Sequence, residues 1–293
     1  MRVDVFMNFT YIENANLAPY CSMKTGGSAE FLVLPKSEDE LIRAISFFKQ
    51  KGKKYIVVGN CSNLIFGDSG FDGAVIITSG IRGLSIENGI ITAFCGETLS
   101  SLARFACDNS LTGLEFCYGI PGTVGGAVYM NAGAYGGEIS QRFVNGRFLK
   151  QDGEIVTLDC EEMDFGYRKS RLNREELIML SATFKADIGN KEEIRIIMDS
   201  LMSKRKTTQP LEFPSCGSAF KRPVGHFAGA LIEQCNLKGY MIGGAQVSEK
   251  HAGFIINRGN ATSGDVIALL EYVSDTVFEK TGVRLEPEIK VIG

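Results

Sequence analysis

The sequence contains no tryptophan and only two histidines, His226 and His251, among 293 residues. No apolar run reaches the roughly 18 residues of a membrane-spanning helix. The start of the chain, Met1 to Thr10, has charged Arg2 and Asp4 and no apolar run of signal-peptide length. The eight cysteines include no C-x-x-C pair, so the closely spaced Cys and His ligands of a zinc site are missing. We therefore expect a soluble cytoplasmic protein with buried thiols and no metal site.

The sequence also lacks a large excess of either positive or negative charge. Lys and Arg total 31 against 34 Asp and Glu, which gives a net charge of −3 and no bulk attraction for nucleic acid or an anionic membrane. Any anionic ligand must therefore be held by local groups. What the chain does have is length and 44% hydrophobic residues, enough for a sizeable core that we interpret as two lobes. No obligate protein partner is evident.

Helix and strand patterns alternate along the first part of the chain, which favours an α+β fold. Residues 37–51 predict a helix in which Ser37 and Glu40 form a capping box. Asn88-Gly89 predicts a hairpin turn, because both positions tolerate positive φ. A second helix is predicted from its capping residue Thr98 onward. The remaining expected elements of this lobe are strands, at 55–58 (short and buried), 74–78, 84–86, 90–94, 147–149, 155–158 and 177–184.

The second lobe is expected to follow an amphipathic helix at 192–206, whose inward stripe is Ile194, Ile197, Met198 and Leu201. It should end in a long helix at 263–281 with an apolar core face. The other elements expected here are a helix near 229–236 and strands around 241–247 and 253–257.

Two glycine-rich segments interrupt these patterns. Gly59-Asn60-Cys61-Ser62-Asn63 follows a predicted strand, and residues 119–137 contain glycine at 119, 122, 125, 126, 133, 136 and 137. A loop without side chains lets several backbone N–H groups converge on phosphate oxygens. Neither segment is G-x-G-x-x-G or contains G-K-[ST], which disfavours Rossmann and P-loop folds. Two interpretations remain open, a set of tight turns and a phosphate-rich cofactor held by two loops.

Five motifs occur in an order that resembles the bacterial UDP-N-acetylenolpyruvoylglucosamine reductases along nearly the whole chain. The motifs are Thr25-Gly26-Gly27-Ser28-Ala29, residues 119–137, Phe165-Gly166-Tyr167-Arg168, Gly217-Ser218-Ala219-Phe220-Lys221 and Glu286-Pro287-Glu288. Together they are very specific, whereas one glycine motif alone is weak. Residues 243–254 resemble the subgroup that lacks an extra tyrosine-bearing substrate loop.

The resemblance implies an FAD-binding lobe of the vanillyl-alcohol-oxidase type at 1–188, in subdomains of about 1–78 and 79–188. A C-terminal α+β substrate-binding domain at 189–293 would follow. It also implies dissociable, non-covalent FAD, NADPH as electron donor, and reduction of UDP-N-acetylglucosamine enolpyruvate to UDP-N-acetylmuramate in peptidoglycan precursor synthesis. By this resemblance the cofactor-binding residues are Gly59, Asn60, Cys61, Ser62, Asn63, Gly119, Pro121, Gly122, Thr123, Gly125, Gly126, Asn131, Gly133 and Ala134.

The same resemblance implies three catalytic residues. Adding a hydride to a carbon–carbon double bond beside a carboxylate leaves negative charge that must be stabilised and then protonated. Arg168 suits the stabilising role, since a guanidinium stays charged and forks onto planar oxygens. Ser218, in a stretch without helical or strand period, is implied as proton donor, and Glu288, expected in the final strand, as the third residue. Each residue also has an ordinary structural interpretation. Arg168 would be a solvated surface charge, Ser218 would cap a turn, and Glu288 would be an exposed residue of a strand.

Cations are expected to hold the UDP portion. Lys206, Lys221 and Arg222 are the candidates, although a helix end with solvated lysines is equally ordinary. Two other functions stay open, an FAD-dependent oxidase of the same architecture and a catalytically silent module that binds nucleotide sugar or flavin. The set of Arg168, Ser218 and Glu288 argues against the oxidase, because alcohol oxidation requires a base and leaves no carbanion to protonate.

Overall fold

The computed structural model describes residues 2–4 and 9–293, which form two compact units. The first unit contains the described residues up to Glu13, Phe31–Asn60 and Gly73–Lys204. The second contains Asn14–Glu30, Cys61–Asp72 and Arg205–Gly293. The contiguous boundaries at 78 and 188 stay a prediction, because the units are assembled from separate segments of the chain.

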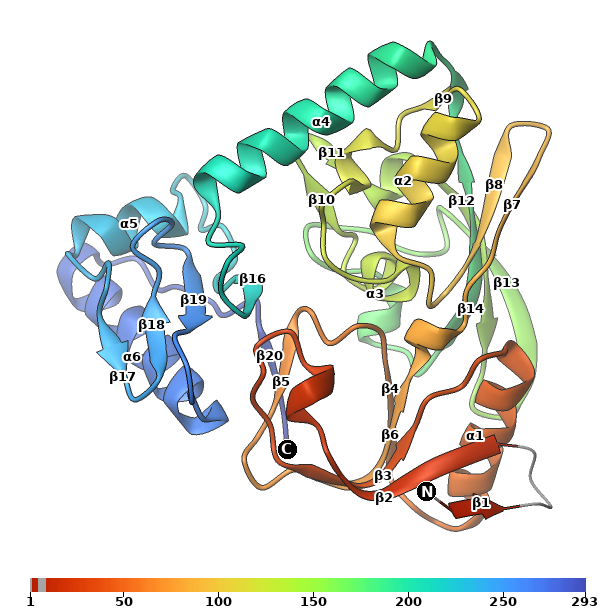
Figure 1. The fold of residues 1–293 in the computed structure, drawn as a ribbon, viewed down its shortest axis with the longest axis horizontal. Helices are drawn as coiled ribbons and strands as arrows, with labels where there is room; N and C mark the ends of the chain where they lie inside the picture. The colour runs from red at the N-terminus through yellow and green to blue at the C-terminus, as the bar shows by residue number, and fades with distance from the viewer. Residues whose placement is uncertain (1, 5–8) are drawn as a thin grey trace. The chain divides into compact units, whose positions relative to one another are not determined.

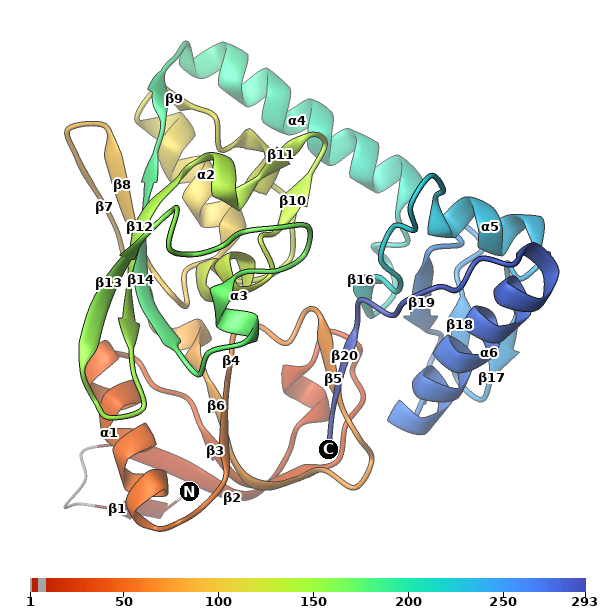
Figure 2. The same cartoon turned by 180° about the vertical axis from the view of Figure 1, so that it is seen from behind.

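A five-stranded antiparallel sheet in the first unit has the strand order β13-β12-β14-β8-β7. Figures 1 and 2 show α2 and α3 on the same side of this sheet. The turn between β7 and β8 has φ of 50° at Asn88 and 76° at Gly89, so the predicted hairpin is confirmed. The elements are β7 (Leu84–Glu87), β8 (Ile90–Phe94), α2 (Leu99–Asp108), α3 (Val124–Tyr129), β12 (Phe143–Leu149), β13 (Ile155–Asp159) and β14 (Ile178–Lys185).

A second five-stranded sheet has the order β1-β2-β3-β6-β4. Helix α1 packs its buried face, which includes Leu41 and Phe48, into the core of the first unit. Ser37 Oγ accepts the Glu40 N–H at 3.2 Å, as predicted, but the Glu40 carboxylate takes the N–H of Lys36 at 2.8 Å. The elements are β1 (Arg2–Asp4), β2 (Phe9–Asn16), β3 (Ser28–Val33), α1 (Glu38–Gln50), β4 (Tyr55–Val58) and β6 (Phe71–Ile77).

The second unit is built on a four-stranded antiparallel sheet with the order β16-β19-β18-β17. Helix α6 packs on β17 and β18, and α5 packs on α6 (Figure 1). The start of α6 is capped twice, by Thr262 and Asp265 and by Asp68, whose carboxylate accepts two N–H groups of the first turn at 2.7 and 2.8 Å. The elements are β16 (Ser215–Ser218), α5 (Ala228–Gln234), β17 (Met241–Ile242), β18 (Ala245–Val247), β19 (Phe254–Asn257) and α6 (Ser263–Thr281).

A parallel pair completes the second unit. Strand β5 (Leu64–Phe66) pairs with β20 (Lys290–Ile292), which brings the end of the chain to the residues that follow Asn63. Besides short 3₁₀ helices, the other described elements are β9 (Leu111–Thr112), β10 (Gly133–Ala134), β11 (Gly137–Glu138), β15 (Asp187–Ile188) and the long helix α4 (Lys191–Thr208).

Four details expected from the sequence are wrong. Ile197 is 46% exposed, so the inward stripe of α4 is narrower than expected. Strand β4 was expected to be buried, but only Val58 is, and the three residues before it are partly exposed. Ser218 ends a strand that has a register shift between Ser215 and Ser218, which hides its period. Glu288 precedes the final strand, because β20 begins at Lys290.

Candidate active site

The glycine-rich loop 119–126 is fixed by backbone hydrogen bonds to the end of β8. The Val124 N–H donates to the Glu97 carbonyl and the Gly125 N–H to the Cys95 carbonyl, both at 2.8 Å. Gly122 has a φ of +137°, a conformation that residues other than glycine rarely adopt. The loop is therefore held through its peptide groups.

Thr123 lies in this loop beside Gly59, which directly follows β4. Thr123 is only 1% exposed, and its Oγ1 has no hydrogen-bond partner among the described residues. A Cβ on Gly59 would lie 2.2 Å from this hydroxyl, so only glycine fits there. A buried hydroxyl without a partner costs about 1–3 kcal/mol, and a phosphate oxygen would satisfy it. These residues therefore fit a phosphate-bearing cofactor such as FAD.

Asn131 is a predicted cofactor ligand whose side chain is fully engaged within the protein. Its Nδ2 donates to the Gly166 carbonyl at 3.1 Å, and its Oδ1 accepts the Ser140 N–H at 2.9 Å. The residue is 1% exposed. The side chain therefore holds the turn that begins at Gly166.

Arg168 lies in that turn. The backbone groups of Gly166 and Lys169 exchange two hydrogen bonds across it, at 3.0 and 3.2 Å, and Arg168 has a φ of 54°. Its Nη2 donates to the Gly133 carbonyl at 3.3 Å, and its guanidinium lies 5.3 Å from the Tyr167 ring centroid. Arg168 is thus brought to the β10 end of the glycine-rich segment, within the first unit.

Cys61, Ser62 and Asn63 continue the other glycine-containing segment in the second unit. The Cys61 thiol is buried and hydrogen-bonded to Cys21, which raises the pKa of Cys61 far above its usual value and lowers that of Cys21. A thiol kept neutral in this way is neither a nucleophile nor a metal ligand. All eight cysteines are free thiols, and seven are buried.

Ser218 is an exposed residue at the end of β16, opposite Phe254 of β19. The next peptide group fixes it: the Ala219 N–H donates to the Gly253 carbonyl at 2.8 Å. The Ala219 carbonyl accepts the Glu288 N–H, also at 2.8 Å. Ser218 and Glu288 are therefore joined through the backbone of Ala219, although 70 positions (288 minus 218) separate them in the sequence.

Glu288 is half-buried and held from the other side by Asn63. The Asn63 Nδ2 donates to the Glu288 carbonyl at 3.1 Å, and the Asn63 carbonyl accepts the Lys290 N–H at 3.0 Å. Asn63 was expected to bind cofactor, and its side chain also places the segment that carries Glu288. Sequence reasoning missed this link, because nothing in the sequence indicates which distant backbone an amide will reach.

The three candidate cations lie in the second unit and differ in their contacts. Lys221 forms an ion pair with Glu286. The Arg222 guanidinium lies 4.0 Å from the Phe227 ring centroid. Lys206 is exposed in the last turn of α4. Their roles as substrate ligands stay predictions.

The described residues contain no group of three or more His, Cys, Asp or Glu side chains arranged for a metal ion. His226 is exposed, whereas His251 is partly buried and accepts a hydrogen bond from the Gly253 N–H at 3.1 Å. No helix in the described part of the chain is long and apolar enough to cross a membrane.

Comparisons with known proteins agree along the chain. A family model described as an FAD binding domain matches residues 29–159, and one described as the C-terminal domain of UDP-N-acetylenolpyruvoylglucosamine reductase matches residues 209–292. The reductase of that name from Caldicellulosiruptor saccharolyticus is 47% identical over 98% of this chain and 93% of its own length. That from Latilactobacillus sakei is 49% identical over 96% and 92%. The crystal structure of the reductase from Thermus caldophilus, 34% identical, covers 98% of this chain and 100% of its own with a TM-score of 0.83.

Proposed function

The chain belongs to the UDP-N-acetylenolpyruvoylglucosamine reductase family, and we propose that Arg168, Ser218 and Glu288 are its catalytic residues. It is a flavin-dependent oxidoreductase of peptidoglycan precursor synthesis, with the expected α+β fold of an FAD-binding lobe followed by a C-terminal domain. Its substrate is UDP-N-acetylglucosamine enolpyruvate, and FAD, when bound, supplies the reducing equivalents that it receives from NADPH.

The first requirement of this reaction is a place for negative charge. Saturating a double bond beside a carboxylate builds charge on the carboxylate and the adjacent carbon. The Arg168 guanidinium meets this need, since it stays ionised at any working pH and presents several donors in one plane. One of its donors already reaches the Gly133 carbonyl, which holds the side chain in place.

The second requirement is a proton, and the observation that carries the proposal is the backbone of Ala219, which links the segments of Ser218 and Glu288. Ser218, which is exposed, directly precedes Ala219, and the Ala219 carbonyl accepts the Glu288 N–H at 2.8 Å. A serine hydroxyl is a weak acid, so it needs a neighbouring group that helps replace the proton. Glu288 serves this purpose: Ser218 gives its proton to the substrate carbon, and the protonated Glu288 carboxyl returns a proton to the Ser218 oxygen.

The UDP portion of the substrate carries phosphates, which we propose are bound by cationic side chains. Lys206, Lys221 and Arg222 bind the UDP portion through its phosphates. Lys221 must exchange its ion pair with Glu286 for the phosphate, and Arg222 offers a guanidinium already oriented by Phe227.

We place the protein in the cytoplasm, where eight free thiols stay reduced.

An anaerobic absorbance titration tests the function. The purified protein is loaded with FAD, then NADPH and afterwards UDP-N-acetylglucosamine enolpyruvate are added while the flavin bands are followed. The expected result is bleaching by NADPH and recovery with the enolpyruvyl substrate. Recovery with oxygen alone would point to an oxidase, and a protein that takes up no FAD would contradict the cofactor assignment.

A further inference from the structure

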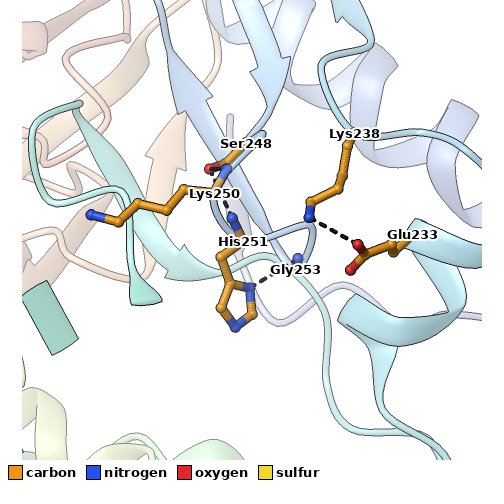
Figure 3. Close-up of polar contacts among 6 residues, drawn as sticks. All are labelled: Glu233, Lys238, Ser248, Lys250, His251 and Gly253. Atoms are coloured by element: carbon orange, nitrogen blue, oxygen red, sulfur yellow. Dashed lines mark hydrogen bonds and ion pairs between the residues drawn. The ribbon is translucent and has the colours of Figure 1, made fainter. Parts of the chain in front are cut away.

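The segment 248–254, between β18 and β19, is a closed turn that ends beside Ser218. Ser248 Oγ accepts the backbone N–H groups of Lys250 and His251, each at 3.2 Å (Figure 3). The Ser248 N–H donates to the Phe254 carbonyl and the Phe254 N–H to the His251 carbonyl, both at 2.9 Å. The turn has little freedom, so a change in one of its contacts is passed to its neighbours.

The His251 ring supplies one more bond inside this turn. Its Nδ1 accepts the Gly253 N–H at 3.1 Å, as Figure 3 shows, and the Gly253 carbonyl in turn accepts the Ala219 N–H at 2.8 Å. The ring centroid lies 4.9 Å from that of Phe254 at an interplanar angle of 65°. A Cβ on Gly229 would lie 3.5 Å from the ring, so helix α5 also limits its movement.

This bond depends on the protonation state of the imidazole. An accepting Nδ1 carries no proton, which means that the ring is neutral with its proton on Nε2. The protonated ring has donors on both nitrogens and would oppose the Gly253 N–H instead of accepting it. Acidification therefore breaks the hydrogen bond.

Several charged groups surround the ring. Burial lowers the pKa of His251 from its usual 6.5, and a hydrogen bond to its own backbone opposes this shift. Of the nearby charges, Lys238 lowers the pKa and Glu233 raises it. Glu233 at the end of α5 and Lys238 in the next turn form an ion pair at 2.9 Å (Figure 3). Glu249 and Lys250 precede the ring in its own segment, and the Lys250 ammonium donates to the Lys206 carbonyl at 2.7 Å. The neutral ring is thus favoured near neutral pH.

We propose that His251 is a positioning residue for Ser218: the neutral imidazole holds Gly253, Gly253 holds Ala219, and protonation of the ring loosens Ser218. The inference rests on the proton donation proposed above for Ser218. This role of His251 involves neither a bound metal ion nor a covalent bond to the flavin.

Three variants separate this role from that of an ordinary turn residue. His251→Asn keeps an acceptor near the position of Nδ1 but does not titrate, whereas His251→Leu keeps the bulk and removes the acceptor. The chain has only one other histidine, the exposed His226, so His226→Asn is the matched control. Ser218→Ala serves as the reference for loss of the proton donor.

The experiment measures both half-reactions of the FAD-loaded protein by anaerobic stopped-flow from about pH 5 to about pH 8. In the unsubstituted protein and in His226→Asn, the rate of reoxidation by the enolpyruvyl substrate should fall as the pH drops below 6.5. The rate of reduction by NADPH should show no such acid limb, meaning no such fall at low pH. In His251→Asn, the acid limb of reoxidation should be absent. His251→Leu should reoxidise about tenfold more slowly than the unsubstituted protein at about pH 8, the equivalent of one lost hydrogen bond, and this difference should shrink as the pH falls.

A second readout does not depend on turnover. The amide NMR signal of Ala219 should shift with pH through the titration of His251 in the unsubstituted protein, and should stay constant in His251→Asn. An acid limb that persists in His251→Asn, or an Ala219 signal that titrates there, overturns the inference. So does normal reoxidation by His251→Leu when Ser218→Ala is slow. If Ser218→Ala reoxidises normally, the role proposed for Ser218 fails as well.

Discussion

The loop 119–126 and the strand end 215–219 are both fixed by backbone hydrogen bonds to residues well removed along the chain. Val124 and Gly125 donate to Glu97 and Cys95, which lie 27 (124 minus 97) and 30 (125 minus 95) positions earlier. Ala219 bonds to Gly253 and Glu288, which lie 34 (253 minus 219) and 69 (288 minus 219) positions later. The two regions differ in what they need from side chains: the proposed cofactor segment depends on missing side chains, whereas the proposed proton-donating segment depends on one hydroxyl.

The largest effect should come from filling the space at Gly59. Gly59→Val places a Cβ 2.2 Å from Thr123 Oγ1, so either the loop shifts or the cofactor site closes. We expect loss of FAD, at least hundredfold weaker binding, equivalent to about 3 kcal/mol. Flavin fluorescence on titration of the apoprotein measures this.

Gly67→Ala is the matched control for that substitution. A Cβ there meets its nearest neighbours at 3.7 and 3.8 Å, which is ordinary contact, and Gly67 has no positive φ. Its FAD affinity should be unchanged. Full FAD occupancy in Gly59→Val would remove this loop from the cofactor site.

Ser218→Ala tests the second region by removing chemistry and leaving the backbone intact. Reoxidation by the enolpyruvyl substrate should slow by about 10²–10⁴-fold, the usual contribution of a positioned acid. Reduction by NADPH should be nearly unaffected. Ser215→Ala, at the other end of the same strand, is the control, and equal losses in both half-reactions of Ser218→Ala would withdraw the role of Ser218.

A single sequence predicts the elements that local signals fix better than the positions that distant pairing fixes. Helix α6 spans the predicted residues 263–281, because its caps Thr262 and Asp265 and the left-handed Gly282 are local signals. Helix α3 was missed, since its six residues contain two glycines. The positions of Ser218 and Glu288 depend on pairing between distant segments, for which a single sequence has no local signal. The family resemblance supplied those two residues.

Asn131 offers a smaller test, because it supports Arg168 from inside the first unit. Asn131→Ala leaves the Gly166 carbonyl and the Ser140 N–H without their partner, and each unsatisfied group costs about 1–3 kcal/mol. We expect the free energy of unfolding to fall by about 3 kcal/mol, as measured by urea denaturation. Asn145→Ala is the control: its side chain is half-buried and accepts a hydrogen bond from the Thr183 hydroxyl, so the loss of stability should be clearly smaller.

Two neighbouring glutamates provide the finest comparison. Glu288 hangs from Ala219, whereas Glu286 forms a surface ion pair with Lys221, and the two flank Pro287. Glu288→Gln removes the carboxyl group that we propose returns a proton to Ser218, and it should slow reoxidation about tenfold or more. Glu286→Gln should leave the rate of reoxidation at saturating substrate unchanged and lower the free energy of unfolding by under about 1 kcal/mol, since an exposed ion pair contributes little. Stopped-flow reoxidation of both variants decides the point, because equal slowing would show that charge near the strand end matters and that Glu288 has no special position.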